Sequence, residues 1–150
     1  MKYVNEKLQE FERYIYNKKV AIIGLGVSNL PLLDYFCDKG AKVTVFDRRT
    51  IDEIEKNILD KITSRCIQFS FGEHNLINLV GFDIIFRSPS CRPDTPELKA
   101  ESLRGAVITS EIEMVVELCP GKVIGITGSD GKTTTTTLIY EILKNNGYNC

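Results

Sequence analysis

The residues best suited to chemistry form one short stretch near the end of the chain, Gly128-Ser129-Asp130-Gly131-Lys132-Thr133-Thr134. An apolar run at 123–127 precedes this stretch, and a helical pattern at 138–143 follows it. The order strand, glycine loop, helix is typical of a loop that wraps the phosphates of a nucleoside triphosphate. Glycines allow the backbone N–H groups to point inward, and the helix start adds unpaired N–H donors. The pattern therefore predicts a triphosphate-binding loop.

Two side chains of this loop are the candidate catalytic residues. Lys132 supplies positive charge for the β- and γ-phosphates, and the Thr133 hydroxyl can bind Mg²⁺. The predicted ATP-binding residues are Gly128, Ser129, Asp130, Gly131, Lys132, Thr133, Thr134 and Thr135. The alternative interpretation is a glycine-rich turn followed by a surface lysine. Five successive threonines, 133–137, favour the functional interpretation, because each β-branched residue costs about 0.5 kcal/mol relative to alanine in a helix.

A second glycine turn, Gly24-Leu25-Gly26-Val27-Ser28-Asn29, follows an apolar strand at 20–23. It resembles the dinucleotide fingerprint G-x-G-x-x-G, with Asp47 about twenty residues further on. Asn29 replaces the third glycine, and two arginines follow Asp47. The helix start attracts phosphate, and Asp47 can accept hydrogen bonds from a ribose or a base. A nucleotide-sugar site is the favoured interpretation, an NAD or FAD site and a purely structural turn being the alternatives.

The elements around these turns alternate between strand and helix patterns. An amphipathic helix is expected over 3–16, because apolar residues recur there at helical spacing. Further helices are expected over about 29–38, 51–62, 96–104 and 110–118, and strands over 20–23, 42–46, 66–71, 82–86 and 106–108. Ser110 and Glu113 form the pattern of a capping box. The alternation predicts an α/β fold: a Rossmann-like, doubly wound, mainly parallel sheet.

A break at Cys119-Pro120-Gly121-Lys122 marks a predicted domain boundary, since Pro-Gly is a strong turn signal. We expect a domain over 1–118, a linker over 119–122, and the first strand, phosphate loop and helix of a second α/β domain over 123–150. One β-α unit cannot bury its own apolar faces. We therefore infer that the chain is a fragment, or that its last segment docks on the first domain.

Composition excludes several classes of protein. The 150 residues are 43% hydrophobic and carry nineteen Lys and Arg against twenty Asp and Glu, which argues against disorder and bulk nucleic-acid binding. No apolar run reaches the roughly 20 residues that span a membrane. The N-terminus lacks a secretory signal, and five scattered cysteines fit reduced thiols, so a cytoplasmic protein is predicted. The lone His74 has no neighbouring metal ligands in the sequence.

Taken together, the two turns resemble those of the Mur ligases of peptidoglycan synthesis. The resemblance is carried by residues 20–28, 45–47, 88–90, 110–113 and 125–133, and it extends over about 18–150. The form T-G-[ST]-[ND]-G-K-[ST] is specific to this superfamily, which includes folylpolyglutamate synthases. The chain departs from the family at Asn29 and Ser90, where glycine is commoner.

The resemblance implies a function for each turn. The first domain would hold the UDP end of UDP-N-acetylmuramoyl-L-alanine through Gly26, Val27, Ser28, Asp47, Arg48, Arg49 and Ser90. The family reaction joins D-glutamate to this substrate by an amide bond, through an acyl phosphate made with ATP and Mg²⁺. The further Mg²⁺ ligands and the amino-acid-binding domain of the family have no counterpart in these 150 residues.

Two other functions stay open at this point. One is a nicotinamide-dependent oxidoreductase that uses Gly24, Gly26 and Asp47, which leaves the lysine loop unexplained. The other is a nucleotide-binding module without catalysis.

Overall fold

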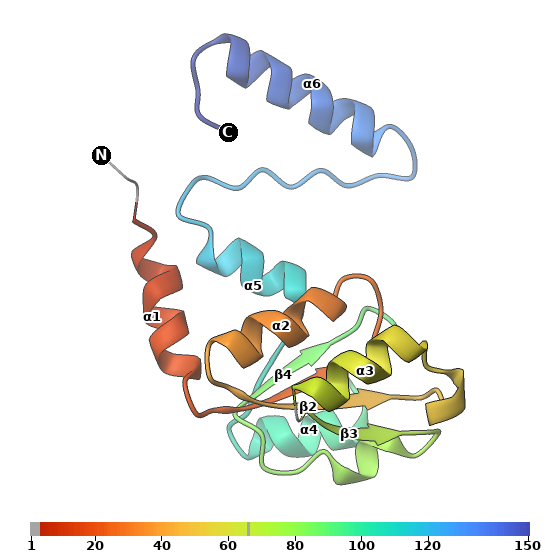
Figure 1. The fold of residues 1–150 in the computed structure, drawn as a ribbon. Coiled ribbons are helices and arrows are strands. Elements are labelled where there is room, and N and C mark those ends of the chain that lie inside the picture. The colour runs from red at the N-terminus through yellow and green to blue at the C-terminus, as the bar shows by residue number, and fades with distance from the viewer. Residues whose placement is uncertain (1–3, 66) are drawn as a thin grey trace. The chain divides into compact units, whose positions relative to one another are not determined.

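The computed structural model describes residues 4–65 and 67–150. The chain divides into two compact units, Met1–Pro120 and Gly121–Cys150. The first is an α/β unit, and the second consists of an irregular segment and one helix (Figure 1).

A five-stranded parallel sheet forms the centre of the first unit. Its strands are β1 (Lys19–Ile23), β2 (Lys42–Asp47), β3 (Gln68–Phe71), β4 (Ile84–Arg87) and β5 (Val107–Thr109). Their order in the sheet is β3-β2-β1-β4-β5. The chain thus moves outward from β1 in one direction, then returns to β1's other side with β4. This is the doubly wound arrangement expected from the sequence.

The apolar run of β1 is buried on both faces of the sheet. Val20 and Ile22 pack into one hydrophobic cluster, and Ala21 and Ile23 pack into another. Successive side chains of a strand point to opposite faces, and a parallel sheet is covered on both. A continuous apolar run is therefore the expected sequence of its central strand.

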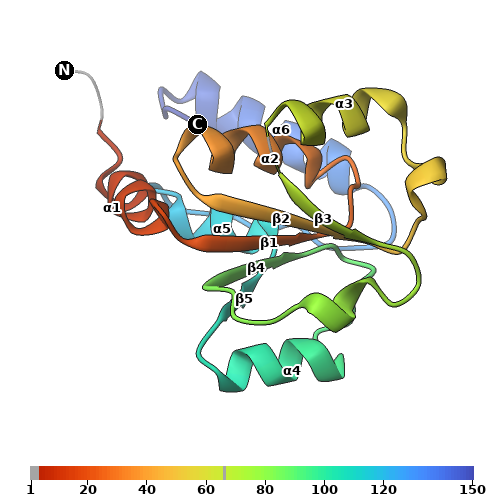
Figure 2. The same cartoon turned by 60° about the horizontal axis from the view of Figure 1, so that its bottom comes forward.

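Helices cover the two faces unequally. The helices α2 (Leu30–Asp38) and α3 (Lys56–Ser64) lie on one face, and α4 (Pro96–Leu103) lies on the other (Figure 2). The ring of Phe36 from α2 packs against Phe86 of β4, with 4.9 Å between ring centroids. Both rings are almost completely buried. The larger core thus joins α2 and α3 to the centre of the sheet.

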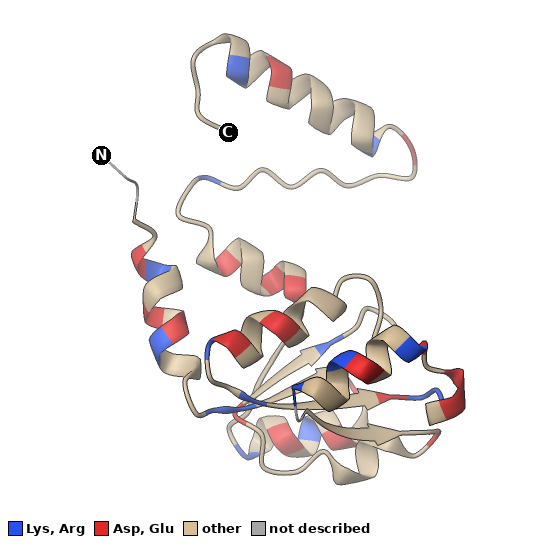
Figure 3. Ribbon diagram, viewed as in Figure 1, with Lys and Arg blue, Asp and Glu red and all other residues tan. Residues whose placement is uncertain are grey.

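Opposite charges line the facing sides of α2 and α3 (Figure 3). Lys61 Nζ lies 2.7 Å from Asp34 Oδ2, and Arg65 contacts both Asp34 and Asp38 at 3.0 and 2.6 Å. These groups are partly exposed, so each pair contributes at most about 1 kcal/mol to stability.

Two further helices of the first unit, α1 (Glu6–Ile15) and α5 (Glu111–Leu118), lie side by side. Asn5 Oδ1 accepts a hydrogen bond from the amide of Leu8 and so caps α1. Asn5 Nδ2 donates to the carbonyl of Leu118 at 2.9 Å, and so links the two helices. Tyr3 and Cys66, which the sequence predictions included in a helix and a strand, lie outside the described residues.

The single helix predicted over 51–62 is wrong. A short 3₁₀ turn at Ile51–Glu53 is followed by an extended Ile54, and α3 begins only at Lys56. Thr50 and Glu53 form a reciprocal capping box that closes the first turn. The isoleucine periodicity predicted burial correctly for Ile54 and Ile58, although the backbone between them is not continuously helical.

The capping box predicted at Ser110 is formed only in part. Ser110 Oγ accepts from the amide of Glu113 at 3.4 Å, but the Glu113 carboxylate turns to Arg87, also at 3.4 Å. Glu113 thus links α5 to the end of β4.

The second unit contains α6 (Lys132–Asn145) and lacks the strand predicted over 123–127. Residues 121–150 are all described, and no strand forms among them. A lone strand has no neighbour for its N–H and C=O groups, so the apolar run alone cannot produce one. Val123 and Ile124 are exposed. Among all described residues, no helix is both long and apolar enough to cross a membrane.

Candidate functional site: two phosphate-binding turns

The first turn lies at the carboxyl edge of the sheet, where β1, β2 and β4 end side by side. The chain reverses its direction of travel between β1 and β4. In open α/β sheets, this reversal leaves a crevice at the carboxyl ends of the strands, where ligands bind. Gly24–Ser28 follows β1 here, Asp47 ends β2, and Ser88 follows β4.

Only glycine fits at position 24. Its φ is +86°, a conformation that costs other residues strain. A Cβ there would lie 3.0 Å from both Cβ and Oγ of Ser88. The amide of Gly24 donates to the carbonyl of Phe46 at 2.7 Å. This glycine therefore lets β1, β2 and the loop after β4 approach one another closely.

Three successive amides at the start of α2 have no acceptor within the described residues. These are the N–H groups of Gly26, Val27 and Ser28, all three of which are exposed. The next amides, of Asn29 and Leu30, both donate to the carbonyl of Gly26. Unpaired amides at the positive end of a helix dipole can bind an anion such as phosphate.

Asp47 is buried beneath this turn and accepts four hydrogen bonds. Its Oδ2 accepts from the amide of Leu25 at 2.7 Å and from Arg49 Nη2 at 3.0 Å. Its Oδ1 accepts from the amide and the Nε of Arg49, both at 3.0 Å. Arg49 Nη2 also donates to the carbonyl of Leu25 at 3.2 Å. The carboxylate thus holds the turn against the end of β2.

The charge state of Asp47 follows from these contacts. Burial acts to raise the pKa of its carboxyl group, but the bonds from Arg49 and Leu25 outweigh burial and hold that pKa below its usual value. The same pairing raises the pKa of Arg49. Both groups are therefore ionised at neutral pH.

The side chain of Asn29 completes the turn from the helix side. It is buried, and its Nδ2 donates to the carbonyls of Ile23 at 3.0 Å and of Gly24 at 2.9 Å. Asn29 lies at the N-cap of α2 but makes no side-chain cap. The sequence did not predict this role, because the two carbonyls belong to the preceding strand and turn.

The remaining candidates of the first site lie around its rim. Arg48 and Ser90 are exposed. The hydroxyls of Ser90 and Ser88 are 2.9 Å apart, so they share a hydrogen bond. The structure thus brings the predicted UDP-binding residues to one edge of the sheet, and their roles in binding remain predictions.

The second turn runs from Gly128 into α6. Gly128 and Gly131 have φ of +153° and +73°, and Gly131 is the N-cap of the helix. The six amides of residues 129–134 donate to no acceptor within the described residues. The predicted ATP-binding residues thus present a continuous run of unpaired N–H donors.

Lys132 folds back over this turn. Its Nζ donates to the carbonyl of Gly128 at 2.5 Å and to that of Ser129 at 3.1 Å. The ammonium group therefore lies beside the unpaired amides, where charge for a phosphate group is needed.

Two of the threonines that the sequence could not assign have a local role. Thr136 Oγ1 donates to the carbonyl of Lys132 at 2.8 Å, and Thr137 Oγ1 donates to that of Thr133 at 2.9 Å. Such bonds to the preceding turn partly satisfy a threonine inside a helix. Thr133 is exposed on the first turn of α6.

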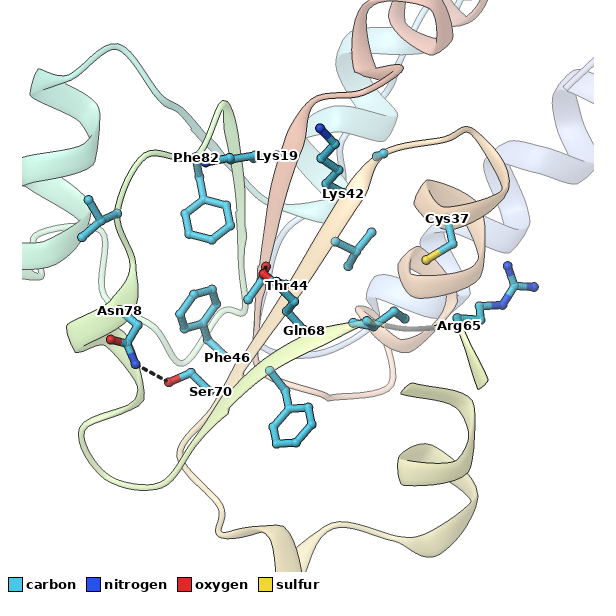
Figure 4. Close-up of a pocket in the computed structure, with 15 residues that line it drawn as sticks. Lys19, Cys37, Lys42, Thr44, Phe46, Arg65, Gln68, Ser70, Asn78 and Phe82 are labelled. Carbon is cyan, nitrogen blue, oxygen red and sulfur yellow. Dashed lines mark hydrogen bonds between the residues drawn. The ribbon is translucent and has the colours of Figure 1, made fainter. Parts of the chain in front are cut away.

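A separate concavity of about 890 Å³ lies in the first unit, away from its glycine turn (Figure 4). It faces the side of β2 and β3 that carries Thr44, Gln68 and Ser70. The side-chain amide of Asn78 donates to Ser70 Oγ at 3.4 Å across it. Within the described part of the first unit, no helix covers these strand residues on this side (Figure 2), which explains why polar residues occupy a parallel sheet here.

No group of three His, Cys, Asp or Glu side chains within the described residues could hold a metal ion. The exposed His74 has no such group around it. The four described cysteines, Cys37, Cys91, Cys119 and Cys150, are free. Any Mg²⁺ at the second turn would thus take its ligands from Thr133 and from phosphate oxygens.

The sheet order and the glycine turn at its reversal define the first unit as a Rossmann-like α/β domain. The model of one family, the Mur ligase MurD-like N-terminal domain, matches residues 18–110. The chain belongs to this family.

Curated relatives agree with this assignment. The chain is 51% identical over 145 residues to the UDP-N-acetylmuramoylalanine--D-glutamate ligase of Clostridium tetani. It is 49% identical over 148 residues to the protein of the same name from Acetivibrio thermocellus. These matches cover 97% and 98% of the chain but 31% of each relative, so the chain spans about a third of their length.

Two solved structures are similar. One is a pseudomurein peptide ligase type C from Methanothermus fervidus, with 29% identity and a TM-score of 0.53 over 87% of this chain and 27% of that chain. The other is a dipicolinate synthase from Bacillus halodurans, with 18% identity and a TM-score of 0.52 over 97% and 53%. The second likeness shows the fold alone.

Proposed function

We propose that the chain is the front part of an ATP-dependent ligase of peptidoglycan precursor synthesis, which joins D-glutamate to UDP-N-acetylmuramoyl-L-alanine. The names of the relatives support this reaction. In it, the substrate carboxylate takes the γ-phosphoryl group of ATP and ADP leaves. The amine of D-glutamate then attacks the acyl carbon, and phosphate leaves.

One observation carries the part assigned to this chain: six unpaired amides and the Lys132 ammonium group surround the second turn. Phosphoryl transfer depends chiefly on positioning and on neutralising charge. Lys132 would neutralise β- and γ-phosphate oxygens, and the amides of 129–134 would orient the phosphate tail. Mg²⁺, when bound, supplies further positive charge at the phosphates, and the Thr133 hydroxyl is the residue here that would hold it.

The first turn has the complementary role in this proposal. The amides of Gly26, Val27 and Ser28 would bind the diphosphate of the UDP substrate. Asp47, Arg48, Arg49 and Ser90 lie where the uracil and ribose would follow. Because all four acceptor positions of Asp47 are occupied, a ligand group reaches its carboxylate only if Arg49 turns away. The same occupation weakens the alternative of a nicotinamide dinucleotide site, which needs a free acidic acceptor for ribose.

The test is ATP–Mg²⁺ binding by calorimetry with the chain of 150 residues. Lys132→Ala is expected to weaken binding by roughly 1.5–3 kcal/mol, the size of a charge-assisted hydrogen bond. Lys144→Ala is the matched control, because it removes the same charge from the last turn of the same helix. Equal affinities for wild type and a folded Lys132→Ala variant would contradict the proposal. NADH, titrated in the same way, is expected to give no saturable signal.

A further inference from the structure

The side chain of Asn29 makes contacts that a simple helix start does not need. Its backbone has φ −90° and ψ −22°, an ordinary right-handed conformation, so no special residue is required for the chain to turn. Yet the residue is only 2% exposed, and its side chain gives both N–H bonds of its amide to two consecutive carbonyls. The opposite orientation of the amide would place its oxygen against both carbonyl oxygens.

These two carbonyls lie directly before the unpaired amides of the turn. The carbonyl of Ile23 also accepts from the amide of Ser88 at 3.0 Å, so it links β1, the loop after β4 and α2. The carbonyl of Gly24 has no other donor within the described residues. Without Asn29, its negative end is left unpaired two residues before the unpaired amide of Gly26.

We propose that Asn29 is a positioning residue of an anion site at this turn. By pairing both carbonyls, its amide directs the oxygens of Ile23 and Gly24 away from the ligand, so that the start of α2 presents N–H donors alone. The anion is a diphosphate or another phosphate ester with two adjacent charged groups. The inference rests on the proposed function of the first turn and adds a role for the residue at which the chain departs from its family.

The experiment measures binding of UDP, inorganic pyrophosphate and uridine to the chain, with backbone amide NMR shifts of Gly26, Val27 and Ser28 as a second readout. Asn29→Ala is expected to weaken pyrophosphate and UDP binding about tenfold, the effect of one net hydrogen bond. The uridine affinity is expected to stay unchanged, and the three amide signals should respond less to pyrophosphate. Ile62→Val, in the core beneath α3, is the control for reduced stability without a change in the turn.

Asn29→Gly is the second variant, because glycine admits water to the two carbonyls where alanine leaves them dry. It should keep the fold and show a smaller loss of pyrophosphate affinity than Asn29→Ala. Wild-type affinity for pyrophosphate in either folded variant would overturn the role of Asn29. Failure of the wild-type chain itself to bind pyrophosphate and UDP would overturn the anion site, and with it the proposed function of the first turn.

Discussion

The two glycine turns of this chain meet the same chemical demand with different amounts of support. The first is held by side chains from three directions: Asn29 from its own helix, Asp47 from β2 and Ser88 from the loop after β4. The second is contacted by one side chain among the described residues, that of Lys132, and no strand precedes it within 121–131. A glycine sequence and a helix start suffice to leave amides unpaired. Fixing them in place requires neighbouring strands.

The largest effect that separates the turns is expected from Asp47→Ala. This change removes four acceptor contacts and leaves the Leu25 amide and the Arg49 guanidinium without their partner. We expect a loss of about 3 kcal/mol in the free energy of unfolding, measured with urea. Lys132→Ala, in the exposed second turn, should change that free energy by less than about 0.5 kcal/mol. Equal effects of the two substitutions would show that the first turn is not the better supported one.

A second comparison places alanine at one glycine of each turn. Gly24→Ala adds a Cβ that lies 3.0 Å from Ser88 in a left-handed conformation, and we expect a loss of about 2–3 kcal/mol in stability. Gly131→Ala is also left-handed, but its Cβ meets nothing within 4 Å, so a loss of about 1 kcal/mol is expected. The urea midpoint for the first unit and the helical circular dichroism for α6 are the two measurements.

The smallest effect concerns pH. Burial acts to raise the pKa of Asp47, and its hydrogen bonds lower that pKa by more, so the folded state holds the carboxyl group ionised more strongly than the unfolded state does. Its contribution to stability is present above the ordinary pKa of about 4 and disappears as the pH falls through the lower folded value. Unfolding free energies measured between about pH 6 and pH 2 should decline less steeply in Asp47→Asn than in wild type. An identical slope would remove this carboxylate from the acid response, leaving other groups such as the buried Glu101, whose pKa is also lowered.

Sequence patterns predicted the first unit well where a local rule and the tertiary fold agree. Pro31 and Gly40 frame α2 as expected, because proline suits a first helical turn and glycine the left-handed exit. At 51–62, the period of the isoleucines matched a helix, but Thr50 and Glu53 closed a separate turn before it. A period reports which residues are buried and does not report where a helix begins.

The failures elsewhere have a common physical cause. The run at 123–127 has the composition of a strand, yet a strand exists only through hydrogen bonds to a neighbour. The role of Asn29 likewise depends on carbonyls five and six residues earlier, which approach it only once β1 and α2 have packed. Both features depend on contacts made after the local elements form, so the sequence of each element alone does not encode them visibly.

The position of Lys132 changes how occupancy of the second turn should be understood. Its ammonium group is already bound to two carbonyl oxygens of its own loop. A phosphate arriving there enters an exchange, in which it competes with the carbonyls of Gly128 and Ser129 for the same N–H donors. The net affinity that lysine contributes is then the difference between two sets of partners, and a substitution that weakens the resting set would tighten nucleotide binding without adding any contact to the nucleotide.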